Sequence, residues 1–177
     1  GANIKLPCVN HSNYQTRIMG KDIYIGFVHI ANLEYKTGQE IEEERRRNGD
    51  FIDLEDFVRR VRTGIEQMVI LIRIDAFRFT CKLKSVLLWE VHMLMNKGKP
   101  LHPNALFYNP PKTYTLPQLE HSLLENAYDE IELVGFPVTL SYFDMLVTTF
   151  RGGIMAKDMI VHVGKKVRML GLLVTIK

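Results

Sequence analysis

Between residues 37 and 96 the sequence alternates between amphipathic helical spacing and turn residues, which limits this region to a set of short helices. Asn48-Gly49 is a natural helix stop, Asp53 is suited to cap the helix that follows, and Gly64 breaks that helix. The region is therefore expected to form two helix pairs. The predicted helices cover residues 37–48, 54–63, 65–72 and 82–96.

Strand-favouring residues flank the helical region. Residues 14–30 are predicted to form two strands joined by a turn at residues 19–22. Five prolines between residues 97 and 117 indicate a linker or irregular loop. Beyond it, helices are expected over residues 119–126 and 142–150, and strands over 159–163 and 167–176. The predicted fold class is mostly α with a small β part (α+β).

Size and composition exclude several classes of protein. A chain of 177 residues is enough for one or two small domains, and a net charge of +3 is only weakly indicative of nucleic-acid binding. Cys8 and Cys81 lie far apart, as expected for thiols in a reducing, cytoplasmic environment. No apolar run approaches the ~18 residues of a membrane span. The ends, Gly1-Ala2 and Lys177, suggest a piece of a larger protein.

Catalysis finds no support in the sequence. The six histidines lack the spacing of a metal site. Asp129, Glu130 and Glu132 form an acidic patch, but they are not the separated aspartates that hold two metals for phosphoryl transfer. We therefore predict no catalytic residue, no metal ligand and no cofactor site within this chain.

Short motifs stand in a fixed order along the chain: Leu6–Tyr14 reads L-P-C-V-N-H-S-N-Y, and Leu71–Phe77 reads L-I-R-I-D-A-F at the end of a helix pair. This order resembles the bacterial DNA polymerase III alpha subunit, in the segment that follows its polymerase core. The first motif is similar to the family's I-N-x-S-x-Y line, and the second falls where the family has S-G-A-F. The resemblance covers nearly the whole chain. It implies a tandem helix-hairpin-helix region, preceded by a β-hairpin and followed by strands leading toward an OB-fold.

The resemblance also implies domain boundaries and partners. The parent protein would be a DNA-directed DNA polymerase that uses Mg²⁺ and works with DNA, a sliding clamp and other replicase subunits. The two alternatives are a divergent, error-prone paralogue and a non-enzymatic helical protein-interaction module. The expected segments are the hairpin end of the fingers (1–30), the helix-hairpin-helix domain (31–98), a linker (99–118), a connector (119–163) and the first strand of a truncated OB-fold (164–177).

The hairpins depart from the family pattern. The family's I-K-G-V-G-E-G falls on residues 30–36, where all three glycines are replaced. Asn32 can still adopt a left-handed conformation, but Glu34 puts a carboxylate where a phosphate would lie. In the second turn, Asp75 replaces a glycine. We therefore favour a structural role for these turns over contact with DNA.

Basic residues near the hairpins are the candidates for DNA contact. Arg59, Arg60 and Arg62 have few acidic neighbours and can follow a phosphate backbone, although a solvated helix face explains them equally well. Asn32 and Lys36 of the first hairpin complete the set.

A further candidate lies in the proline-rich segment. Leu106 and Phe107 match the apolar anchors of the family's clamp-binding peptide, whereas Pro103 replaces its usual glutamine. The alternative, that both side chains pin the linker onto the core, is slightly favoured.

Overall fold

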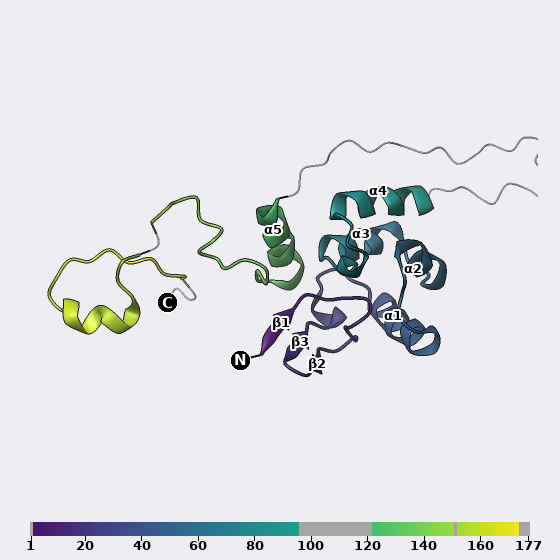
Figure 1. Ribbon diagram of the computed structural model, residues 1–177, viewed down its shortest axis with the longest axis horizontal. Coiled ribbons are helices and arrows are strands. Elements are labelled where there is room, and N and C mark those ends of the chain that lie inside the picture. The colour runs from purple at the N-terminus through teal and green to yellow at the C-terminus, as the bar shows by residue number, and fades with distance from the viewer. Residues whose placement is uncertain (1, 96–121, 151, 174–177) are drawn as a thin grey trace, which may run out of the picture. The chain divides into compact units, whose positions relative to one another are not determined.

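The computed structural model describes residues 2–95, 122–150 and 152–173. The chain divides into two compact units, residues 1–139 and 140–177, which are described separately. The first unit holds a small sheet and the main helices, and the second is made mostly of turns and one 3₁₀ helix (Figure 1).

A three-stranded sheet opens the first unit, in the order β1-β3-β2. The hairpin of β2 (Arg17–Met19) and β3 (Asp22–Tyr24) confirms the predicted strand pair, although both strands are shorter than expected. β1 (Asn3–Lys5) pairs in parallel with β3 and was not predicted. Past β3 the predicted second strand does not continue, because a short 3₁₀ helix, η1 (Phe27–His29), follows instead.

The helical region follows the predicted order of helices. Gly49, with φ of +77°, ends the first helix, and the side chain of Asp53 accepts a hydrogen bond from the backbone N–H of Asp56 at the start of the second. Gly64 precedes the third, as expected. The bounds of the helices are α1 Tyr35–Asn48, α2 Leu54–Arg60, α3 Ile65–Arg73, α4 Lys84–Met95 and α5 Leu123–Val134.

The core of the first unit forms around α3, which packs against α4 and α5, while α2 also packs against α4 (Figure 1). Phe57 lies at its centre, with ring centroids 4.8 Å from Phe51 and 4.9 Å from Phe77. Burying each such side chain contributes about 1.5–3 kcal/mol. Other fully buried members are Phe27, Ile41, Leu54, Met68, Leu71, Ile72, Ile74 and Leu87.

Several elements predicted after residue 118 are wrong. The predicted helix at 119–126 lies later, as α5, and residues 119–121 are outside the described range. Residues 142–150 form turns and bends. The strand expected at 159–163 overlaps a 3₁₀ helix, η3 (Ala156–His162), and residues 164–173 contain no strand. A strand needs a hydrogen-bonded neighbouring strand, and no described residue forms a strand beside residues 159–173.

Candidate nucleic-acid interface

The first hairpin, residues 30–34, connects η1 to α1 and keeps a left-handed residue. Asn32 has φ of +62°, and it lies at a position where the family that this sequence resembles has glycine. Asparagine is one of the few residues that adopt this conformation at low cost. The hairpin is also fixed from outside, because the N–H of Ala31 donates to the carbonyl of Leu133 at 2.7 Å. The backbone course of the turn therefore does not require glycine here.

Gln67, in the first turn of α3, joins that helix to the hairpin. Its Oε1 accepts from the N–H of Glu34 at 2.8 Å, and its Nε2 donates to the carbonyl of Asn32 at 3.2 Å. The hydroxyls of Thr37 and Thr63 lie 3.4 Å apart beside it. These contacts bring the N-termini of α1 and α3 together.

Both helix N-termini lack a side-chain cap. Neither Glu34 at α1 nor Gly64 at α3 supplies a capping hydrogen bond. The first N–H groups of a helix carry a partial positive charge and have no acceptor within the helix. Two such ends on one surface favour the binding of anionic groups.

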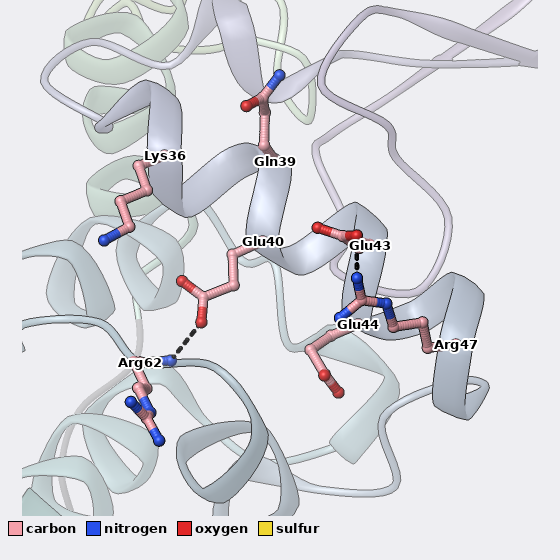
Figure 2. A pocket seen from close by; sticks show the side chains of 7 residues that line it. All are labelled: Lys36, Gln39, Glu40, Glu43, Glu44, Arg47 and Arg62. Atoms are coloured by element: carbon pink, nitrogen blue, oxygen red, sulfur yellow. Dashed lines mark hydrogen bonds and ion pairs between the residues drawn. The ribbon is translucent and has the colours of Figure 1, made fainter.

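Two of the candidate cations lie beside these helix ends. Lys36 and Arg62 line a hollow of about 460 Å³ along α1, with Arg47 at its far end (Figure 2). Glu40 projects into the same hollow and accepts a hydrogen bond from the backbone N–H of Arg62 at 3.1 Å, while Glu43 pairs with Arg47. The surface thus mixes cations with carboxylates rather than forming a continuous basic patch.

Arg59 and Arg60 are neighbours in sequence but not in environment. The Arg59 side chain is 76% exposed and makes one ion pair, with Asp56 at 2.7 Å. The Arg60 side chain is only 13% exposed, and it bonds both Asp56, at 2.9 Å, and Glu44, at 3.3 Å. Its guanidinium also lies 4.3 Å from the centre of the Phe51 ring. The guanidinium of Arg60 is therefore bonded to groups of the protein itself.

The pKa of the Asp56 carboxyl shows the effect of this pairing. Burial raises that pKa, but hydrogen bonds from Arg59, Arg60 and the backbone N–H of Ile52 outweigh it and hold the pKa below its ordinary value. The carboxylate stays ionised and anchors both arginines at α2.

The second turn, residues 74–77, ends α3 in a Schellman motif. The N–H of Ala76 donates to the carbonyl of Leu71, and that of Asp75 donates to Ile72. Asp75 has φ of +61°, and it also lies at a position where the family that this sequence resembles has glycine. The carbonyl of Ala76 accepts from the N–H of Val9 at 3.2 Å. The peptide groups of this turn are therefore bonded within the protein, which supports its structural role.

Sequence reasoning missed the part played by residues 61–64, between α2 and α3. Charge alone points to Arg62 in the sequence, but in the structure its loop links α2 to α3 and contacts α1 through Thr37 and Glu40. The available signal was Gly64 immediately before an apolar helical run. Leu106 and Phe107 lie outside the described residues.

Within the described part of the chain there is neither a metal-binding cluster nor a membrane-spanning helix. No three His, Cys, Asp or Glu side chains there come close enough together to hold a metal ion. Within those same ranges, no helix is long and apolar enough to cross a membrane. Cys8 is buried and Cys81 is exposed, and both are free thiols.

A family model covers the first part of the chain. Residues 1–85 match the model described as the helix-hairpin-helix motif, so this part of the chain is similar to that motif. The match includes the hairpin before α1, the loop between α2 and α3, and the Schellman turn. It ends at the start of α4.

Several curated relatives are named DNA polymerase III subunit alpha, which confirms the expected resemblance. The protein of Thermus aquaticus is 29% identical over 99 residues, covering 50% of this chain and 8% of the relative. That of Staphylococcus epidermidis is 23% identical over 139 residues (75% and 13%), and that of Staphylococcus aureus 26% over 148 (78% and 14%). The chain thus spans between 8% and 14% of the length of these relatives.

Proposed function

We propose that the helix-hairpin-helix region binds duplex DNA through its phosphates, without reading bases, as part of a DNA polymerase III alpha-type protein. The observation that carries the proposal is the convergence of two uncapped helix N-termini, of α1 and α3, beside Lys36 and Arg62. Backbone N–H groups at such ends bind phosphate oxygens, and flexible cations add sequence-independent attraction.

The charge balance of this surface predicts weak binding. Lys36, Arg59 and Arg62 are exposed cations, whereas Glu34 and Glu40 place carboxylates near the same helix ends. If three cations neutralise phosphates, the logarithm of affinity falls with the logarithm of salt concentration with a slope of roughly −3. Arg60 is left out of this set because its guanidinium is already bonded within the protein.

The test is fluorescence anisotropy of a labelled duplex titrated with the 177-residue chain at two salt concentrations. The double variant Lys36→Gln, Arg62→Gln is compared with Lys5→Gln, Lys21→Gln, which removes the same charge from exposed residues near the sheet. We expect the first to lose most of the affinity and the second to retain it. Equal loss in both would contradict the proposed surface, and so would salt-resistant or sequence-specific binding. No duplex binding at any salt would favour a protein-interaction module.

For the longer protein, we propose DNA-directed DNA polymerase activity in the cytoplasm, in the company of other replicase subunits. The support is the similarity to relatives named DNA polymerase III subunit alpha. Mg²⁺ would supply charge neutralisation in nucleotidyl transfer. The described residues do not fit as its ligands, since they bring no three suitable side chains together, so no step of that chemistry is assigned to them.

We also propose that Leu106 and Phe107 form a sliding-clamp contact, on the strength of their match to an apolar anchor pair in a proline-rich segment. The test compares wild type with the variant Leu106→Ala, Phe107→Ala for binding to the cognate clamp. Removing two such anchors is expected to cost a few kcal/mol, or about 100-fold in affinity. Equal affinities would assign both residues to packing of the linker.

A further inference from the structure

A second hollow lies on a different side of α1 from the proposed DNA surface. It has a volume of about 520 Å³ and is bordered by the C-terminal half of α1, by the segment before β2 and by β2 itself. This volume falls in the range of small-molecule sites, ~300–1,000 Å³. Three arginines line it: Arg17, Arg45 and Arg46.

Arg45 supplies a fixed positive charge. Its Nη1 donates to the carbonyls of Val9 and Ser12, both at 2.7 Å, and its Nη2 donates to the side-chain oxygen of Asn13 at 2.6 Å. All three acceptors are neutral, and no carboxylate of the described chain forms an ion pair with this guanidinium. Its charge is oriented by the fold but not neutralised by direct contact.

The other charged groups leave the hollow positive. Arg17 has no ion pair within the described ranges, and Arg46, with a side chain 76% exposed, approaches Glu43 only at 3.7 Å. Two carboxylates also line the hollow, Glu42 and Asp50, and Glu42 is engaged by the backbone N–H of Tyr14 at 2.8 Å. Three arginines against two carboxylates give a net charge of +1 before any ligand binds.

His11 adds a neutral donor to the same wall. Its Nδ1 lies 3.2 Å from the thiol of Cys8, and its ring stacks on Tyr24 at 5.0 Å. Burial and then the charge of Arg78 lower the pKa of His11, and Arg45 and Arg17 add to this, against an opposing effect of Asp50. If Nδ1 accepts from the thiol, the proton of the neutral ring is on Nε2, which is then a hydrogen-bond donor.

We propose that this hollow binds a phosphate monoester, either on a nucleotide or at the phosphorylated end of a nucleic-acid strand. The N–H groups of an arginine guanidinium match the oxygens of a phosphate group in geometry. The two negative charges of a phosphate monoester would also offset the electrostatic repulsion among the three guanidinium groups. Arg17 and Arg46 reach the phosphate from the rim, Arg45 contributes its fixed charge, and His11 donates from the wall. This site does not depend on the proposed duplex-binding surface.

Calorimetry and NMR on the 177-residue chain test the proposal, with inorganic phosphate and 5′-AMP as probes at ionic strength matched with chloride. The variants are Arg17→Gln and Arg46→Gln, and the control is Lys82→Gln, an exposed cation that does not line the hollow. Each rim variant is expected to weaken binding about tenfold, the effect of losing one charged hydrogen bond, while the control binds as wild type. Thermal unfolding of each variant verifies that it is folded.

Two further measurements keep the result interpretable. In wild type, saturation with phosphate should move the NMR titration of His11 to higher pH, since a bound dianion offsets Arg17, Arg45 and Arg78. Single-stranded oligonucleotides with a 5′-phosphate should compete with AMP, and those with a 5′-hydroxyl should not. Absence of saturable phosphate binding, equal weakening by Lys82→Gln, or competition by both oligonucleotides would overturn the proposal.

Discussion

Replacing Arg60 by methionine separates its structural role from any role in DNA binding. Methionine keeps much of the length of the side chain and its apolar contact with Phe51, but removes every hydrogen bond. Those bonds reach the carboxylates of Asp56 and Glu44 and the carbonyls of Glu44, Gly49 and Asp50. The guanidinium therefore ties the end of α1 to α2 across the turn that contains Phe51.

The expected loss follows from burial. Breaking a buried ion pair from one side costs about 3–5 kcal/mol, because the partner charge stays desolvated. Asp56, with a side chain 9% exposed, still keeps Arg59 after the change, so we expect a smaller loss, about 2–3 kcal/mol. Arg59→Met is the matched control: its side chain is 76% exposed, and losing one surface ion pair costs about 0.2–1 kcal/mol.

Urea unfolding followed by tryptophan fluorescence measures both variants. Trp89 is the only tryptophan of the chain and lies in α4, which packs on α2 and α3, so its signal reports on the first unit. Comparable midpoints for the two variants would refute the structural role of Arg60. So would a large loss of duplex affinity in folded Arg60→Met, because that would show the guanidinium in contact with DNA.

The ion pair of Arg60 with Asp56 also makes the stability of the protein depend on pH, in a predictable direction. The pKa of Asp56 is lowered in the folded protein, so its stabilising contribution is present above the ordinary aspartate pKa of about 3.9. This contribution is lost as the pH falls from there toward the folded pKa. The difference in stability between wild type and Arg60→Met should therefore be largest near neutral pH and shrink below about pH 4.

Two further substitutions test how the helices are held. Gln67→Leu removes both hydrogen bonds between α3 and the first hairpin, so it should lower stability by about 1–3 kcal/mol and weaken duplex binding several-fold, as measured by urea unfolding and anisotropy. Glu130→Ala leaves the N–H groups of Val138 and Thr139 without their carboxylate acceptor, so it should destabilise the first unit by about 1–3 kcal/mol in the same unfolding assay, with duplex affinity unchanged.

Local signals were sufficient for α1, α2 and α3, but insufficient for β1 and for the segments after residue 118. The stops and caps at Gly49, Asp53 and Gly64 depend on neighbouring residues only, and they set α1, α2 and α3 to within a few residues. β1 is a three-residue strand whose parallel pairing with β3 is a non-local contact without an alternating pattern. Residues 159–163 have strand-like composition but no described partner, and they form most of a 3₁₀ helix instead.

In the candidate site, too, local sequence patterns identified some features, and others depend on contacts between distant residues. Composition identified Arg59, Arg60 and Arg62 as one cluster, but only the fold shows that Arg60 turns inward while its neighbours stay exposed. The contact of Gln67 with Asn32 and Glu34 joins positions more than thirty residues apart and has no sequence signature. Two of the family's glycine positions, those that fall on Asn32 and Asp75, do coincide with positive φ, whereas the one that falls on Glu34 does not.

Substitutions in the first hairpin test whether backbone shape or charge limits DNA binding. Asn32 has φ of +62°, a conformation that costs most side chains roughly 1–2 kcal/mol and asparagine less. Asn32→Ala should therefore lower stability by about 1 kcal/mol, whereas Asn32→Gly should be as stable as wild type or slightly more so. Glu34 has φ of −64°, so glycine is not needed there, and its carboxylate is the obstacle.

Glu34→Gln should accordingly raise duplex affinity at low salt several-fold and change stability little, because only its backbone N–H is bonded to Gln67. Asn32→Gly should leave affinity near that of wild type, since the turn already has the required shape. Unfolding curves and anisotropy titrations of the three variants separate the two effects. An affinity that rises with Asn32→Gly but not with Glu34→Gln would mean that shape, not charge, limits binding. If neither changes the affinity, this hairpin does not face DNA, and the duplex must contact another surface of the helix-hairpin-helix region.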